Sequence, residues 1–178
     1  MLHEEHSAGR DVALAVNLSG RTMSDPGLGE YLEALLAARP IEPGRLVIEV
    51  TETAAIVNID RARRLAERLH ALGCRFALDD FGAGFASFYY LKHLAFDYLK
   101  IDGEFVRQLV HDPTDQLVIE AVVNIARGLG TRTVAEFVGD EPTVELLQRL
   151  GVDYGQGYHL GMPVPIGDVL AGERTRRV

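Results

Sequence analysis

Short runs of apolar residues alternate along this chain with longer stretches in which apolar residues recur every three or four positions. The first pattern is typical of β-strands and the second of amphipathic α-helices. The runs predict six strands, at 13–19, 46–52, 76–80, 96–102, 132–138 and 153–158. The longer stretches predict helices at 25–38, 59–72, 88–94, 115–128 and 141–150, another within 163–174, and the last turns of one in the first ten residues.

Strands that alternate with helices predict a parallel sheet with right-handed crossovers. The first run, 13–19, is interrupted by one Asn and is expected to be a buried strand. An open doubly wound sheet would gather its functional groups at one switch point, whereas a barrel receives them from every strand. Polar residues recur near the C-terminal ends of all the predicted strands: Asn17, Glu49, Asp79, Asp80, Lys100, Glu136 and Gln156. The expected fold class is therefore α/β, a TIM-type (β/α) barrel.

The stretch 76–85 carries the strongest chemical signal. Its apolar run ends in Asp79 and Asp80 and continues into a turn that contains Gly82 and Gly84. Side chains alternate along a strand, but the pleat relaxes where a strand meets a loop, so both carboxylates can reach one site. Two adjacent acids repel each other, and a divalent cation would relieve that repulsion. The alternative is an ordinary acidic turn, because Asp and Gly are common turn residues.

Composition restricts the classes of function. With 178 residues, of which 47% are hydrophobic, the chain can bury one sizeable core, and residues 1–178 are expected to form a single domain. The net charge of −8 argues against a nucleic-acid polymer as a partner, because proteins that bind one usually carry a basic face. A small phosphate ligand is compatible with this charge if metal ions neutralise the acids locally.

Cysteine content and hydropathy bear on the cellular compartment. Cys74 is the only cysteine, which excludes an intramolecular disulfide and a cysteine-rich zinc site, and it is expected in the core. No apolar run approaches the roughly 20 residues that a membrane span needs. This segment is expected to be cytoplasmic and without direct membrane contact, although the parent protein could be membrane-anchored.

Six short motifs follow one another along the chain. They are Val-Asn-Leu-Ser with Asn17, Glu-Val-Thr-Glu with Glu49, Asp-Asp-Phe-Gly-Ala-Gly from Asp79, Lys-Ile-Asp-Gly with Lys100, Ala-Glu with Glu136, and Gln-Gly-Tyr with Gln156. In order and spacing they resemble the EAL-domain cyclic di-GMP phosphodiesterases, over residues 12–165 or thereabouts. The resemblance implies a TIM-type barrel and metal-dependent hydrolysis of cyclic di-GMP to linear pGpG in bacterial second-messenger signal transduction.

The resemblance also implies a role for each motif residue. Such an enzyme uses two Mg²⁺ or Mn²⁺ ions, which prefer hard oxygen ligands and activate a bridging water. One ion would be bound by Asn17, Glu49 and Asp79, and Asp79 would bridge to a second ion that Asp80 also holds. Lys100 would orient or help deprotonate the attacking water, Gln156 would position it, and Glu136 would complete the shell. Glu52 would support the loop from Asp80 to Ser87, which includes Gly82 and Gly84.

Each of these residues also has a structural interpretation. Asn17 could form a turn at a strand end, and Gln156, between two glycines, could mark a tight bend. Lys100 could pair with Asp102, which alternation places on the same face of the strand. Glu49 and Glu52 could be acidic caps for the helix that follows the second strand, and Thr51 and Thr53 could share that role.

The chain departs from the family pattern at two places. The Glu-Ala-Leu motif that names the family lies on the first barrel strand, and this chain begins after that strand. The Glu-Ala-Leu at 33–35 falls inside an amphipathic helix instead. The family also usually has a Glu three residues after the one at Glu136, where Gly139 stands here, with Asp140 beside it as a substitute only if the loop rearranges.

These departures shape the functional expectation. A barrel incomplete at its N-terminus, without the first metal-ligand Glu, is expected to be weakly active or inactive. The alternative is a catalytically incompetent EAL module that binds cyclic di-GMP or serves regulation or dimerisation. The open edge of the strand at 13–19 predicts a homodimer, because unpaired strands invite a second chain. The parent protein is expected to carry GGDEF or sensor domains, which often accompany this family.

Overall fold

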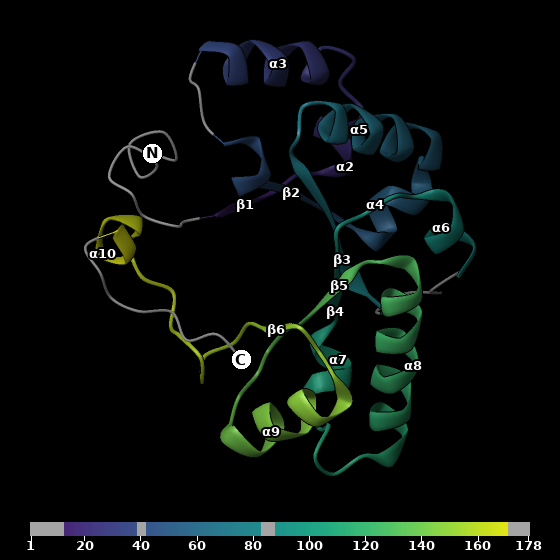
Figure 1. The fold of residues 1–178 in the computed structure, drawn as a ribbon, viewed down its shortest axis with the longest axis vertical. Coiled ribbons are helices and arrows are strands. Elements are labelled where there is room, and N and C mark those ends of the chain that lie inside the picture. Colours follow the sequence, from purple (N-terminus) through teal and green to yellow (C-terminus); the bar gives the residue numbers. More distant parts are fainter. Residues whose placement is uncertain (1–12, 39–41, 83–87, 171–178) are drawn as a thin grey trace. The chain divides into compact units, whose positions relative to one another are not determined.

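The computed structural model describes residues 13–38, 42–82 and 88–170 (Figure 1). Packing divides the chain into two compact units. The first comprises the residues up to Asp79 together with 84–97, and the second comprises 80–83 together with the residues from Tyr98 onward. The division lies between Asp79 and Asp80, inside a single β-strand.

The first unit contains three parallel strands and the helices that follow them. Its elements are β1 (Leu14–Asn17), α2 (Gly20–Met23), α3 (Leu28–Ala38), a 3-10 turn (Pro43–Arg45), β2 (Leu46–Thr51), α4 (Glu52–Val57), α5 (Ile59–Ala71), β3 (Arg75–Phe81) and α6 (Phe88–His93). Strand β2 lies between β1 and β3, and both pairings are parallel. The apolar residues of α5 are buried, and this helix packs against α2 and α4.

The second unit repeats the alternation of strand and helix. Its elements are β4 (Tyr98–Ile101), α7 (Gly103–Val106), α8 (Pro113–Leu129), β5 (Arg132–Ala135), α9 (Glu141–Leu150), β6 (Tyr154–Gly155) and α10 (Ile166–Leu170). Strand β5 pairs in parallel with β4 and β6, and α8 packs against β5, α7 and α9 (Figure 1). The strands follow one another in the sheet in sequence order, β1 to β6. Strictly parallel strands with intervening helices confirm the α/β prediction.

The prediction that the first strand is buried was wrong. Leu14 is half-buried and the next three residues of β1 are exposed, whereas the first five residues of β2 are all buried. Strand β1 stands at one end of the strand order, so β2 covers it on one side and its apolar residues, such as Val16, reach solvent. A hydrophobic run alone does not distinguish an end strand from a central one.

Several strands are shorter than predicted, and beside both ends of β4 side chains make other interactions. Strand β4 begins after Asp97, whose carboxylate accepts a hydrogen bond from the backbone N–H of Phe76 at 2.8 Å. It ends before Asp102, whose carboxylate caps α7 by accepting from the N–H of Glu104. Strand β5 ends at Ala135, and β6 has two residues in place of the predicted six.

Other predictions concerned helices. The short helices α2, α4 and α7 were not predicted, since four to six residues carry little periodicity. Helix α3 begins at Leu28 and not at Asp25, because the Asp25 carboxylate accepts a hydrogen bond from the N–H of Gly27 and holds a turn there. Cys74 is buried, as predicted, and burial raises the pKa of its thiol. The helix expected in the first ten residues lies outside the described residues.

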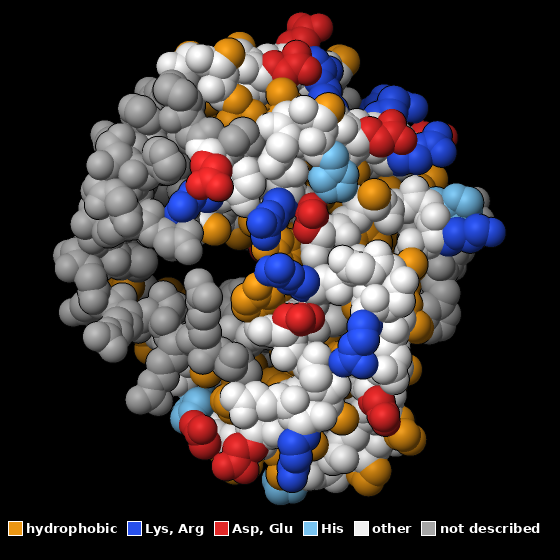
Figure 2. Space-filling view, in the orientation of Figure 1, with side chains coloured by type: hydrophobic (Ala, Val, Ile, Leu, Met, Phe, Trp, Pro, Cys, Tyr) orange, Lys and Arg blue, Asp and Glu red, His pale blue; other side chains and the backbone are white. Residues whose placement is uncertain are grey.

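Charge is mixed over the face of the molecule that Figure 2 shows. Figure 2 shows Lys and Arg side chains interspersed with Asp and Glu, including its upper part, where α3 and α5 lie. Such a distribution differs from the continuous basic face of a nucleic-acid-binding protein. Among the helices of residues 13–38, 42–82 and 88–170, none combines the length and the apolar character that crossing a membrane requires.

Candidate metal centre

Three predicted ligands share one face of the first unit's strands. The register places Asn17 of β1 beside Glu49 of β2, and Thr51 beside Asp79 of β3. Side chains two residues apart in a strand point the same way, so Asn17, Glu49 and Asp79 project from the same face. Glu49 and Asp79 are buried, at 8% and 7% exposure, while Asn17 is exposed at the end of β1.

Asp80 has a left-handed backbone conformation, with φ of 55°. Strand β3 continues through Phe81, so both acids lie within the strand. The sequence, in contrast, predicted them at its end. In a regular strand their side chains would point to opposite faces. The positive φ interrupts this alternation, and it is sterically costly for a residue with a Cβ. This local strain is therefore what allows the carboxylates of Asp79 and Asp80 to come together.

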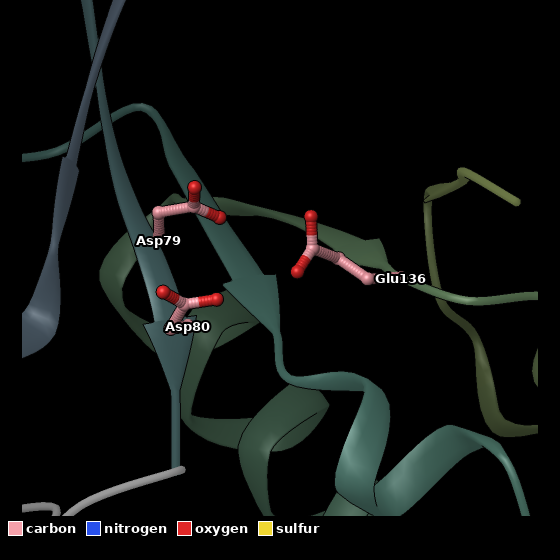
Figure 3. A group of neighbouring side chains, drawn as sticks. All are labelled: Asp79, Asp80 and Glu136. Carbon is pink, nitrogen blue, oxygen red and sulfur yellow. The ribbon is translucent and has the colours of Figure 1, made fainter. Parts of the chain in front are cut away.

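Glu136 joins these two acids. Asp80 and Glu136 both belong to the second unit, and Asp79 precedes Asp80 in β3. One carboxylate oxygen from each of the three residues lies within 4.8 Å of the other two. Figure 3 shows the carboxylates of Asp79 and Glu136 turned toward each other, with that of Asp80 beside them. Asp79 and Glu136 are buried and Asp80 is half-buried.

Lys100 of β4 forms an ion pair with Glu136. The Lys100 Nζ lies 2.9 Å from Glu136 Oε1, and the two side chains are only 6% and 11% exposed. The structural interpretation had paired Lys100 with Asp102, but the Asp102 carboxylate caps α7. Lys100 therefore brings a positive charge to the cluster of carboxylates through Glu136.

Glu136 is held at a sharp turn immediately after β5. The next residue, Phe137, has φ of 55° and is 55% exposed. Its ring lies so close to the backbone of Gly103 that a Cβ on that glycine would overlap it. The guanidinium of Arg107 covers the ring, with its central carbon 4.1 Å from the ring centroid. These contacts hold a turn that no sequence pattern predicted.

Gln156 follows β6 and is linked to this turn through the backbone. Its N–H donates to the carbonyl of Ala135 at 2.8 Å, and its carbonyl accepts from the N–H of Val138 at 3.0 Å. Gly157 approaches the backbone of Val138 so closely that a Cβ would overlap it. The interpretation of Gln156 as part of a tight bend thus agrees with the structure, and its side chain is exposed.

The residues predicted to support the loop are only partly described. Glu52 is the first residue of α4 and is 3% exposed, and Thr51 provides the N-cap of that helix, as its structural interpretation proposed. Gly82 has φ of 102°, which a residue with a Cβ rarely adopts, and a Cβ there would meet the ring of Phe105. Two further predicted residues lie outside the described residues: Gly84 and Ser87.

Asp140 does not take the place of the Glu expected at Gly139. It is the N-cap of α9, and its Oδ1 accepts a hydrogen bond from the backbone N–H of Thr143 at 2.9 Å. Hydrogen bonds from the Thr143 side chain and backbone hold the pKa of Asp140 below its ordinary value. The carboxylate is thus engaged in capping a helix and not in the cluster of Asp79, Asp80 and Glu136.

Replacement of Asp140 by Ala is expected to lower the free energy of unfolding by about 1 kcal/mol at pH 7, through loss of the cap. Because the pKa is lower in the folded state, the stabilisation is present above the unfolded pKa of about 3.9 and disappears as pH falls through the folded value. Urea unfolding of Asp140→Ala and the wild type at pH 7 and pH 3 measures both effects. Asp140→Asn is the control, since Asn caps as well as Asp. An Ala variant as stable as wild type at pH 7 would contradict the capping role.

The carboxylate cluster suits a divalent cation. All its donors are carboxylate oxygens, which Mg²⁺, Mn²⁺ and Ca²⁺ prefer. Oxygens that bind Mg²⁺ at about 2.1 Å lie up to about 4 Å apart across the ion, so small movements from the present separations suffice. The neighbouring lysine balances part of the negative charge of the cluster. No zinc-like arrangement of His and Cys occurs among the candidate metal-binding groups of the described residues.

The fold and this cluster define an α/β protein with a candidate site for divalent metal. The chain belongs to the EAL domain family, which matches residues 1–163. Its fold class is therefore the TIM-type barrel of EAL domains, as the sequence predicted.

Relatives and solved structures agree with this membership. The cyclic di-GMP phosphodiesterase PdeB of Shewanella oneidensis is 38% identical over 94% of this chain and 20% of its own length. The PaMucR phosphodiesterase, solved as a c-di-GMP complex, is 37% identical with a TM-score of 0.87, over 94% of this chain and 68% of that one. The EAL domain of Mycobacterium smegmatis DcpA is 30% identical with a TM-score of 0.90, over 99% and 80%. The chain thus spans about a fifth of PdeB.

Proposed function

We propose that the protein containing this chain hydrolyses cyclic di-GMP to linear pGpG with the help of Mg²⁺ or Mn²⁺. The observation that supports this most is the cluster of Asp79, Asp80 and Glu136, with oxygens within 4.8 Å of one another. Named phosphodiesterases among the relatives support the same substrate. In that reaction water attacks phosphorus, the bond between phosphorus and a ribose oxygen breaks, and the released oxygen takes a proton.

Five residues of this chain would bind the metal ions. Asp79, Asp80 and Glu136 would hold the metal ions, together with two residues on the same face as Asp79, which are Asn17 and Glu49. When bound, the ions would lower the pKa of a water and neutralise charge on the phosphoryl oxygens.

Lys100 would act from the other side of Glu136. Its ammonium would draw the Glu136 carboxylate into position and offset negative charge as the phosphoryl group reacts. Gln156 would position substrate or water from the adjoining bend, and Glu52 would support the loop that begins at Asp80.

Hydrolysis of cyclic di-GMP with Mn²⁺ by the protein that contains this chain, compared with its Asp79→Asn variant, tests the proposal. We expect linear product from the wild type, no product with excess EDTA, and a loss of at least about 100-fold in the variant, because Asp79 lies in the cluster. Asp60→Asn is the matched control, since it removes the same charge from an exposed position in α5. Turnover that survives both EDTA and Asp79→Asn would overturn the proposal.

A second candidate is a module that binds cyclic di-GMP without hydrolysing it. Asp140 favours this candidate, because it caps α9 and Gly139 provides no carboxylate where the family usually has a Glu. Calorimetric binding of cyclic di-GMP, measured beside the assay, separates the two functions. Binding without product would support the second candidate, and product formation would exclude it.

A further inference from the structure

A concave site lies in the first unit, between α5 and the segment that joins α2 to α3. The cavity has a volume of about 410 Å³, within the range of small-molecule sites. One wall consists of Arg61, Arg64 and Arg68, at intervals of three and four residues, so they share one face of α5. None of the residues that line it belongs to the candidate metal centre.

Two of the three guanidinium groups are held in place by neighbouring residues. Arg61 Nη1 donates a hydrogen bond to the carbonyl of Ser24 at 2.9 Å. Arg68 Nε donates to Glu33 Oε1 at 2.7 Å, and its guanidinium lies directly against Gly29, where no side chain intervenes. The interaction with Glu33 raises the pKa of Arg68. Both groups keep further N–H donors beyond these bonds, because a guanidinium carries five.

Arg64 stands between them along the helix. It is exposed, and within the described part of the chain it makes no ion pair. In contrast, Arg63 next to it pairs with Asp60 at 3.4 Å and does not line the cavity. The cavity therefore contains two guanidinium groups that pair with no carboxylate of the described residues, those of Arg61 and Arg64, whereas Arg68 pairs with Glu33.

The rest of the lining sets the character of the ligand. Met23 and Leu65 provide buried apolar surface, and Asp25 is the single acid, with one oxygen occupied by the N–H of Gly27. The lining has three positive groups and one negative group, and Glu33 neutralises Arg68, so the local net charge is +1 in a chain whose net charge is −8. Arg forks match phosphate oxygens in geometry as well as charge.

We propose that this cavity binds a small organic phosphate monoester, with its apolar body against Met23 and Leu65 and its dianionic group among the three arginines. A phosphate group would pair with Arg61 and Arg64, which pair with no carboxylate in the described part of the chain, and the apolar surface distinguishes an ester from inorganic phosphate. Figure 2 shows acidic side chains interspersed with the basic ones over α3 and α5. A long polyanion would meet these acids, whereas a small ligand inside the cavity would not.

Phenyl phosphate is the probe that tests this site, with inorganic phosphate and phenol as partial probes. Titration of the ¹⁵N-labelled chain, followed by NMR, should give saturable shifts in α5 and at the start of α3. We expect phenyl phosphate to bind at least about fivefold more tightly than either partial probe. Arg64→Gln should weaken its binding about fivefold or more, and Arg63→Gln, with the same loss of charge, should leave it unchanged.

Three outcomes would overturn the proposal: no saturable shift at α5, equal affinity for inorganic phosphate, or equal weakening in the two Arg variants. Both substituted positions are exposed on the helix, so neither change is expected to unfold the chain. The readout needs no metal and no hydrolysis. Failure of this proposal is therefore distinguishable from failure of the phosphodiesterase proposal.

Discussion

Replacing Asp80 with Asn is expected to lower the affinity for Mn²⁺ by about 100-fold or more while leaving the metal-free protein at least as stable as the wild type. Loss of a residue that only supports a metal ligand already costs roughly 10- to 100-fold, and Asp80 belongs to the cluster itself. Asn tolerates the left-handed conformation that Asp80 adopts, so the backbone of β3 can remain as it is. Removing one of three neighbouring charges also relieves their repulsion.

Calorimetric titration with Mn²⁺ measures the change in metal affinity, and urea unfolding without metal measures the change in stability. The Asp60→Asn variant serves as control, because it makes the same chemical change at an exposed position in the first turn of α5. Equal Mn²⁺ affinity in Asp80→Asn and the wild type would show that the carboxylate cluster is not the metal site. A large loss of stability in the metal-free variant would show instead that Asp80 has a structural role.

Replacing Lys100 with Met is expected to lower the free energy of unfolding by about 3 kcal/mol. The Lys100–Glu136 pair is almost fully buried, and removing one partner of such a pair leaves a charge in a poorly solvated position. The exposed pair between Arg63 and Asp60 offers a comparison, because Arg63→Met should cost no more than about 1 kcal/mol.

A double variant separates the ion pair from other effects of the substitution. Adding Glu136→Gln to Lys100→Met removes the charge of the unpaired partner, so it should restore much of the lost stability. Urea unfolding of the wild type, both single variants and the double variant provides the coupling energy. If the double variant is as unstable as Lys100→Met alone, the packing of the lysine side chain, and not its charge, stabilises this part of the protein.

The alternation of strand and helix was predictable because each element carries its own periodicity. The long helices α5, α8 and α9 agree with their predicted positions to within two residues at each end. Asn17, Glu49 and Asp79 were predicted at strand ends. Asn17 does end β1, whereas Glu49 and Asp79 lie two residues before the ends of β2 and β3, and the register places all three on one face. Their proximity has a physical basis, since parallel strands present their carboxyl ends at the same edge of a sheet.

Predictions failed where the conformation depends on partners distant in sequence. The strand predicted to run through Val138 ends at Ala135, because Phe137 adopts a positive φ against Gly103 and Arg107. No local sequence pattern in Ala-Glu-Phe-Val predicts that turn. The exposure of β1 likewise depends on its place in the strand order and not on its composition.

The sequence by itself determined the α/β class, the order of the elements and the acids that gather near strand ends, because these follow from local periodicity and from motifs with fixed spacing. Only the tertiary structure decided which acids meet. It brings Asp79 and Asp80 to one side through a strained φ, sets Glu136 beside them and buries Lys100 against it. It also assigns Asp140 to a helix cap. These outcomes depend on residues that are close in space but distant in sequence. The sequence alone therefore does not distinguish an Asp that caps a helix from one that faces a cation.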